Sequence, residues 1–298
     1  MNIGTAARLE VLHRLALQDQ PGSRQEADIH SRCSWSIFLL ETIFTPQFTV
    51  LRQDPSPPPF PESVPIPLPL PSHMRQGHRQ GRADVEGAEV RDFGINTYSL
   101  RSISAWGEIV AYLHAVRCGE IENAWSSTST FNQLAIKLYD LDAQIYPKHL
   151  LRHTAFQNRH LDELQRDAEY WRPWILMQFV FHGSHALLNH PFVHLLALRG
   201  NSRATQSGFF LQKTIDQALF HSAWIVRLID TCESLGFEVN DPLIGHIVAA
   251  TFTISWILQF ARDRTVSTKA LEGMGKCERF IQGISRTWPH INYQVCLD

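Results

Sequence analysis

The densest group of residues that could bind a metal or carry protons is a set of four histidines: His182, His185, His190 and His194. The first two are three residues apart, so they share a face of any helix that contains them. Zinc or iron needs three or four converging ligands, often with carboxylates. Pro191, directly after His190, is expected to break the helix that holds the first pair, and no acidic residue lies between Trp171 and Arg199. We therefore expect hydrogen-bonded histidines and no metal-ligating residue.

Two further motifs resemble a metal-binding motif and a phosphate-binding loop, but each lacks residues that the site requires. Glu10 and His13 match E-x-x-H, but a di-iron helical bundle needs this motif twice with two more glutamates, and no second copy is found. The stretch Gly273–Lys276 resembles the end of a phosphate-binding loop. Ala270 stands where the first glycine must be, and Cys277 replaces the magnesium-binding Ser or Thr. We expect no catalytic residue, no cofactor and no enzymatic activity.

The cysteines and the overall charge exclude other classes of function. Five cysteines are scattered along the chain without a C-x-x-C pair, so neither a zinc cluster nor a redox dithiol can form locally. An odd, scattered set predicts buried thiols in a reducing compartment. With a net charge of -2, the chain lacks the positive field that draws proteins onto DNA or an anionic membrane.

One apolar segment resembles a membrane span. Residues Leu243 to Ala261 carry no Asp, Glu, Lys or Arg, but several polar side chains interrupt them. This mixture predicts a buried core helix and no membrane association. Met1 to Glu10 has neither the basic region nor the apolar region of a signal peptide.

The positioning elements are predicted to be helices. Apolar spacing indicates a helix before Pro21 and another over Asp28–Phe44. In the second helix we expect one buried side with a wider flank formed by Trp35 and Leu39; the residues of that side are Cys33, Ile37, Leu40 and Phe44. Past residue 92, one helix is predicted to be capped by Ser99 or Ser102 and the next by Ser129. Another helical stretch is predicted to open at Pro147. Four long helices are predicted after it: Pro173–Asn189, Phe209–Leu235, Asp241–Phe260 and Lys269–Ser285. Core packing is expected for four tryptophans: Trp106, Trp174, Trp224 and Trp256.

A proline-rich segment interrupts this helical pattern. Nine prolines lie between Asp54 and Pro71, and each fixes φ and removes a donor, so the backbone there must be extended. The following Ser72–Arg91 is polar and contains the only basic run, which we interpret as a solvated linker. The predicted organisation is all-α: a helical part (1–52), a proline-rich and polar linker (53–92) and the main helical part (93–298).

Short patches, read in order, carry a resemblance to a known family. Arg32–Glu41 is similar to a helix written R-R-x-F-W-x-L-F-x-L-D, and Leu187–Phe192 to a segment L-L-H-R-P-F. Further matches are Leu12–Arg14, Ala124–Ser129 with Leu134, Ile145–Pro147, Asp241–Gly245 and Trp288–Pro289. Together they resemble the fungal-specific transcription factor domain, the middle homology region of Zn2Cys6 regulators, over nearly the whole chain. Members of that family usually begin with a cysteine cluster, which this sequence lacks, so zinc ligands and DNA-reading residues are not carried over.

The resemblance implies a nuclear transcription regulator that controls a metabolic or biosynthetic gene cluster. Such a chain would act through a protein partner, either a related factor or a co-regulator, contact DNA only indirectly, and respond to a small-molecule effector. A cysteine cluster encoded just upstream would make it part of a longer protein. Two alternatives are a helical protein-interaction scaffold and a helical enzyme that uses the group His182, His185, His190 and His194.

Overall fold

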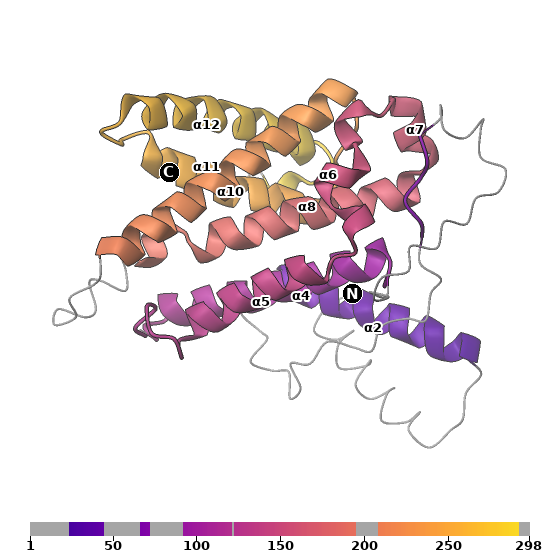
Figure 1. Ribbon diagram of the computed structural model, residues 1–298, viewed down its shortest axis with the longest axis horizontal. Helices are drawn as coiled ribbons and strands as arrows, with labels where there is room; N and C mark the ends of the chain where they lie inside the picture. Colours follow the sequence, from indigo (N-terminus) through magenta and orange to yellow (C-terminus); the bar gives the residue numbers. More distant parts are fainter. Residues whose placement is uncertain (1–23, 45–65, 72–91, 121, 195–207, 292–298) are drawn as a thin grey trace, which may run out of the picture.

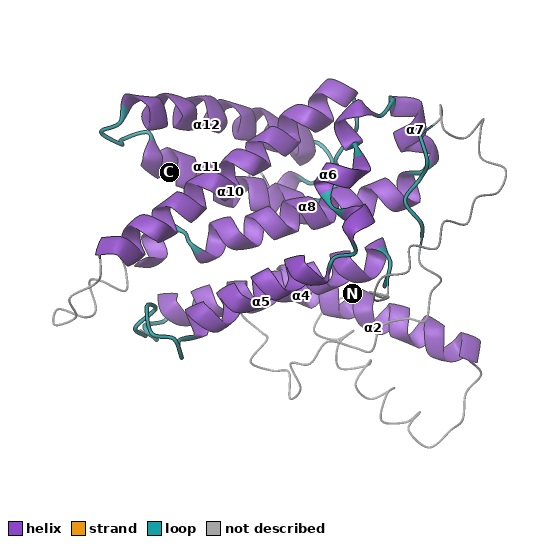
Figure 2. Cartoon of the chain, in the orientation of Figure 1, coloured by secondary structure: helices purple, strands orange, loops and turns teal. Residues whose placement is uncertain are grey.

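The computed structural model describes residues 24–44, 66–71, 92–120, 122–194 and 208–291. These residues form α-helices and short 3-10 helices and contain no strand (Figure 2), which confirms the all-α prediction. The helix predicted before Pro21, the motif Glu10–His13 and the basic run after Ser72 lie outside the described residues.

The helices are named in chain order. The α-helices are α2 (Arg24–Phe44), α4 (Ile95–Arg117), α5 (Thr130–Gln144), α6 (Leu151–Thr154), α7 (Leu161–Arg166), α8 (Ala168–Leu188), α10 (Gly208–Leu235), α11 (Pro242–Leu258) and α12 (Arg264–Ser285). The 3-10 helices are η2 (Pro147–His149), η3 (Phe156–Asn158) and η4 (Pro289–Ile291).

Helix α8 is the centre of the fold. It crosses the middle of the molecule in Figure 1, with α2, α4 and α5 on one side and α10, α11 and α12 on the other. It packs directly against α4, α5, α10 and α11. Fourteen of its 21 residues are buried, as expected for a helix that other helices enclose. The rotation of α8 about its own axis therefore decides which of its side chains face α10.

The core consists of two clusters of buried side chains. The larger surrounds α8 and includes Trp171, Trp174 and Ile247, with contributions from α4, α10, α11 and α12. The smaller fills the space between α4, α5 and the end of α8, where Ile109 and Leu188 are fully buried. Both clusters use α8, so the two halves of the molecule are joined through it.

Local capping signals locate two helix starts correctly. The Ser129 side chain accepts a hydrogen bond from the Asn132 N–H, and Asp241 accepts one from the Leu243 N–H. Both side chains satisfy amide groups that the first turn of a helix leaves without an intrahelical partner. The predicted cap at Ser129 is confirmed, and Asp241, predicted as the first residue of its helix, is the capping residue just before α11.

The predicted start of α4 at Ser99 or Ser102 is wrong. The helix begins at Ile95, after Gly94, whose φ of 83° lies in the region that favours glycine. The Asp92 carboxylate accepts the Gly94 N–H at 2.8 Å and turns the chain into the helix. Ser102 lies inside the helix, where its hydroxyl donates to the Tyr98 carbonyl, so a good capping residue is used as a helix-interior one.

Two other helices begin earlier than predicted. Pro173 does not open α8 but is its sixth residue, inside the helix, where a proline cannot donate the usual intrahelical hydrogen bond. Helix α12 begins at Arg264 and not near Lys269. Asp263 caps it by accepting the Thr265 N–H at 2.8 Å.

Helix α2 buries a different side from the predicted one. Cys33 and Leu40, placed on the buried side by the sequence pattern, are exposed. Trp35 and Phe38 are buried instead, and α2 packs on α4 through them and Thr42. Every position from Cys33 to Leu40 is apolar or small, so periodicity alone does not single out one side there.

Part of the predicted linker packs on the helical body. Residues 66–71 have no helix or strand, and Ile66 and Leu68 lie against the larger core cluster. The Arg159 guanidinium donates to the Pro69 carbonyl at 3.0 Å. This segment runs beside α7 in Figure 1. A row of alternating prolines thus supplies alternate apolar side chains to the core, as an edge strand would.

Exposure corrects two expectations about apolar side chains. Trp106 and Trp174 are buried as expected, and Trp224 is half-buried, but Trp256 on α11 is 45% exposed. Cys33 and Cys118 are exposed, whereas Cys232 and Cys277 are buried. Among the described helices, none combines the length and apolar character that crossing a membrane requires.

Candidate functional site

A pocket of about 440 Å³ lies where α8 and α10 face the segment from α5 to α6. Five residues of α8 line it: Met177, Gln178, Phe181, His182 and His185. Four residues of α10 face them: Gln217, Phe220, His221 and Trp224. Each set follows the spacing of residues that share one helix face. The remaining wall is formed by Tyr139, Asp142, Ile145, Leu150 and Leu151.

Three histidines meet in this pocket. Nδ1 of His182 lies 3.0 Å from Nδ1 of His221, so one ring carries a proton there and donates it to the other. The His185 ring stacks on that of His221 with centroids 4.3 Å apart and an angle of 7° between planes. The contacts join α8 to α10 through imidazole rings.

All three rings are neutral at physiological pH. Burial lowers the pKa of His182 to about 3, that of His185 to about 4 and that of His221 to about 2, because a charged imidazolium would lose its hydration. The mutual proximity of the rings lowers the pKa of His182 and His221 further. A histidine with such a low pKa is a weak base at pH 7. The arrangement suits binding better than proton abstraction.

The four histidines singled out by their spacing do not form one group. His182 and His185 line the pocket, but His190 and His194 do not. His190 Nε2 lies 3.0 Å from the Thr253 hydroxyl on α11. His194 packs edge-on against Phe131 and Phe210. Burial lowers the pKa of both to about 4.

Sequence reasoning missed His221. It is 36 residues after His185 in the numbering, on another helix, and no short motif links the two. A usable signal was the spacing of Gln217, Phe220, His221 and Trp224, which marks one mixed polar and aromatic face of α10. Only the packing of α10 on α8 shows that this face meets the histidines.

Asp142 is the one carboxyl group among the described residues that line the pocket, and it is exposed. Partial burial raises its pKa, and the charge of Arg152 acts in the opposite direction. Within the residues that the structure describes, no three histidine, cysteine, aspartate or glutamate side chains are arranged to hold a metal ion. The three imidazole rings of the pocket interact with one another through a hydrogen bond and stacking in this structure.

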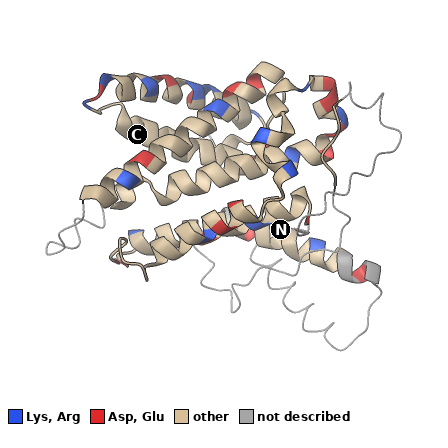
Figure 3. Cartoon of the chain, in the orientation of Figure 1, with Lys and Arg blue, Asp and Glu red and all other residues tan. Residues whose placement is uncertain are grey.

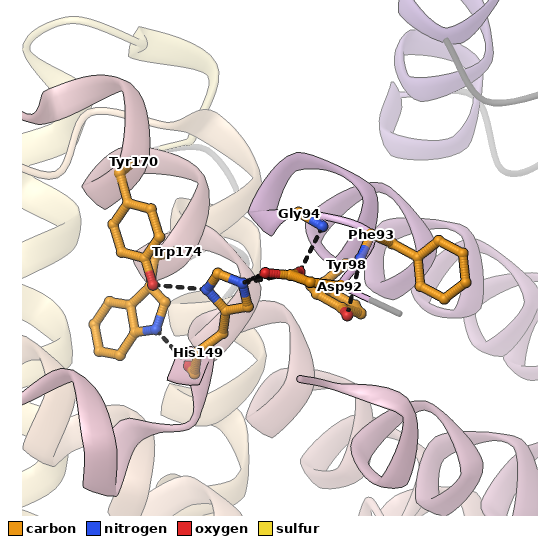
Figure 4. Close-up of polar contacts among 7 residues, drawn as sticks. All are labelled: Asp92, Phe93, Gly94, Tyr98, His149, Tyr170 and Trp174. Atoms are coloured by element: carbon orange, nitrogen blue, oxygen red, sulfur yellow. Dashed lines mark hydrogen bonds and ion pairs between the residues drawn. The ribbon is translucent and has the colours of Figure 1, made fainter. Parts of the chain in front are cut away.

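A second polar cluster resembles a catalytic triad. His149 places Nδ1 2.8 Å from the Tyr170 hydroxyl and Nε2 3.1 Å from Asp92 Oδ2 (Figure 4). The Trp174 indole donates to the His149 carbonyl at 2.8 Å.

This cluster is too buried for catalysis. His149 and Tyr170 are each 1% exposed, which denies a substrate access to both. Burial also raises the pKa of Tyr170, so its hydroxyl stays protonated. Asp92 at the same time accepts the Gly94 N–H, so the cluster fixes the start of α4 onto η2 and α8 (Figure 4).

A larger pocket of about 670 Å³ lies between α4 and α5. Three of its four charged side chains, Glu108, Glu122 and Lys137, have partners. Glu122 accepts the N–H groups of Thr130 and Phe131 at the start of α5, and Lys137 pairs with Glu108. These interactions stabilise the helix pair, and we take the pocket between α8 and α10 as the candidate site.

The cysteines and the glycine-containing stretch that the sequence analysis considered form no reactive or phosphate-binding site among the described residues. Burial raises the pKa of Cys232 and of Cys277 to about 12, so neither is a thiolate at neutral pH. The stretch Gly273–Lys276 is part of α12 and forms no loop. Lys276 pairs with Asp230 of α10 and so connects two helices.

Charges of both signs are interspersed on the described helices. In the view of Figure 3, blue and red segments both occur along the described helices, scattered among tan ones. Comparison of the chain with protein-family models, with curated proteins and with solved structures finds no match.

Proposed function

We propose that this chain is a regulatory helical domain of a transcription regulator, of the kind found in fungal Zn2Cys6 factors, and that it responds to a small-molecule effector. The observation that carries the proposal is the pocket between α8 and α10. It combines aromatic walls with a few uncharged polar groups, which is the usual composition of a small-molecule site. The sequence patches that resemble the family agree with this proposal.

In this proposal the chain reaches DNA through a partner in the nucleus. Phosphate contacts need a basic surface, and base recognition needs an element that enters a groove. The described helices have interspersed charges, and the sequence has no cysteine pair for a zinc cluster. A related factor or a co-regulator that binds the helices would supply the contact with DNA.

The scaffold alternative has one specific observation in its favour. Trp256 and Phe260, at the end of α11, pack edge-on with centroids 6.0 Å apart and are 45% and 73% exposed. Exposed aromatic side chains are typical of protein interfaces. The enzyme alternative loses its four-histidine group, because His190 and His194 take no part in the lining of the pocket.

A reporter assay tests the proposed function. The full chain is fused to an unrelated DNA-binding domain, and transcription is compared with that domain alone in cells of a fungal host. We expect the fusion to change transcription, and Trp224→Ala in the pocket to alter the response while the protein level stays the same. A fusion that leaves transcription unchanged in every growth condition would contradict the proposal and favour the scaffold.

A further inference from the structure

We propose that the pocket between α8 and α10 binds an uncharged, planar aromatic compound that carries a hydroxyl or carbonyl group. The inference rests on the proposed function in that it specifies the effector's chemistry. Its evidence is independent and comes from the shape, the charge and the hydrogen-bonding groups of the pocket.

The walls are flat and aromatic. His182 stacks on Trp224 with an angle of 5° between planes and centroids 5.4 Å apart. Phe181 packs edge-on against His185 at 4.9 Å. Phe220 meets Trp224 edge-on and adds a further ring. Aromatic rings prefer stacked or edge-on partners, so a planar ring system fits such walls. The volume of about 440 Å³ lies within the range of about 300–1,000 Å³ typical of small-molecule sites.

The charge of the lining excludes anions. Among the described residues, no Lys or Arg lines the pocket, and its three histidines are neutral. A carboxylate or phosphate would lose its hydration there without gaining a counter-charge. Asp142, exposed beside the pocket, would add repulsion.

Two polar side chains in the lining lack partners. Gln178 has 8% of its residue surface exposed; no hydrogen bond joins its amide to any other described residue, and the amide is not among the fully enclosed polar groups, so it is accessible from the pocket. Nε2 of His185 is buried and likewise has no partner among the described residues. The two residues are seven apart on α8 and share one face. Buried polar groups are normally paired, so a ligand oxygen or hydroxyl is the missing partner.

The test compares three probes that share one ring system and differ in charge. Purified full chain is titrated with 2-naphthol, 2-naphthoate and 2-naphthylmethylamine at pH 7.5 by calorimetry. We expect 2-naphthol to bind at least about tenfold more tightly than 2-naphthoate, a difference that one desolvated charge readily supplies. Tighter binding of 2-naphthoate or of the amine, or no binding of any probe, would overturn the proposal.

Variants locate the binding. Gln178→Leu keeps the size of the side chain and removes its amide, and Trp224→Ala removes one wall; we expect each to weaken 2-naphthol binding at least about fivefold. Trp256→Ala on α11 is the matched control, because Trp256 is exposed and does not line the pocket, and should leave binding unchanged. Equal binding by wild type and Gln178→Leu would overturn the assigned role of the amide. Circular dichroism establishes that each variant is folded.

The two proposals fail separately. A reporter fusion that responds in cells while none of the probes binds would refute the ligand class and leave the regulatory function standing. Binding of 2-naphthol to the pocket together with a silent reporter would support the ligand class and refute the regulatory function.

Discussion

Nδ1 of His182 on α8 lies 3.0 Å from Nδ1 of His221 on α10. This contact joins the two helices in the wall of the pocket, and the ring of His185 stacks on that of His221. Because neither ring is charged, the pair shares one proton and needs both nitrogens to be satisfied. The stability of the pocket wall should therefore depend on the pair as a unit.

A double-mutant cycle measures this dependence. His182→Phe or His221→Phe alone leaves a buried ring nitrogen without a partner, and we expect each to lower the free energy of unfolding by about 1–3 kcal/mol. Replacing both should cost less than the sum of the two single changes, because no nitrogen is then left unpaired. Urea denaturation at pH 7.5 provides the free energies. Strict additivity would show that the two rings do not interact.

The buried histidines predict sensitivity to acid. Burial lowers five histidine pKa values from 6.5 to between about 2 and about 4; the residues are His182, His185, His190, His194 and His221. Below pH 6.5 the unfolded chain binds protons that the folded chain does not, so stability falls as the pH decreases. Each histidine contributes a loss of about 1.4 kcal/mol per pH unit over that interval. Denaturation midpoints measured from pH 7.5 to pH 4.5 should decrease steeply.

His194 offers a single-site test of this pH dependence. Its Nε2 is buried and has no partner among the described residues, and its ring packs against Phe131 and Phe210. We expect His194→Phe to maintain stability at pH 7.5 and to reduce the slope of stability against pH by about one proton. An unchanged slope would mean that His194 does not stay neutral in the folded protein.

The close packing of α8 against α11 can be tested at Gly183. A Cβ at this position would lie 2.6 Å from Cγ2 of Ile247 on α11, which is fully buried. We expect Gly183→Ala to lower stability by about 1–3 kcal/mol through overpacking. Gly283→Ala on α12 is the matched control: its Cβ would meet nothing within 4 Å, so helix propensity should raise stability by about 0.5–1 kcal/mol. Equal changes in the free energy of unfolding for Gly183→Ala and Gly283→Ala would contradict the close contact between Gly183 and Ile247.

Metal content tests the interpretation of the histidines. We expect the purified protein to contain no stoichiometric zinc or iron, because the His182–His221 contact uses two of the ring nitrogens in a hydrogen bond. Elemental analysis of protein purified without chelators or an affinity tag is the measurement. About one tightly held metal ion per chain, lost in His221→Phe, would restore the enzyme alternative.

Selection from random duplex DNA tests the need for a partner. We expect the isolated chain to enrich no sequence at physiological salt, since its net charge is -2 and its one basic run is a glycine-containing stretch. Fluorescence anisotropy on any enriched duplex then gives the specificity. A motif bound about a thousandfold more tightly than random DNA would refute indirect recruitment.

The sequence by itself determined the class of the fold and those elements whose signals are local. The absence of strand alternation predicted an all-α chain, and the cap at Ser129 was identified because a cap acts on an amide group only a few residues away. The sequence also excluded a phosphate-binding loop at Gly273–Lys276, because that motif requires particular residues at fixed spacing.

Tertiary structure alone decided which faces are buried and which residues meet. Helix α2 buries Trp35 and Phe38, not Cys33 and Leu40, because the position of α4 selects one of several equally apolar sides. His221 joins His182 because α10 packs on α8 in one register, a relation between helices that no local pattern encodes. The pocket exists only through that packing, since burial both lowers the histidine pKa values and brings the aromatic rings together.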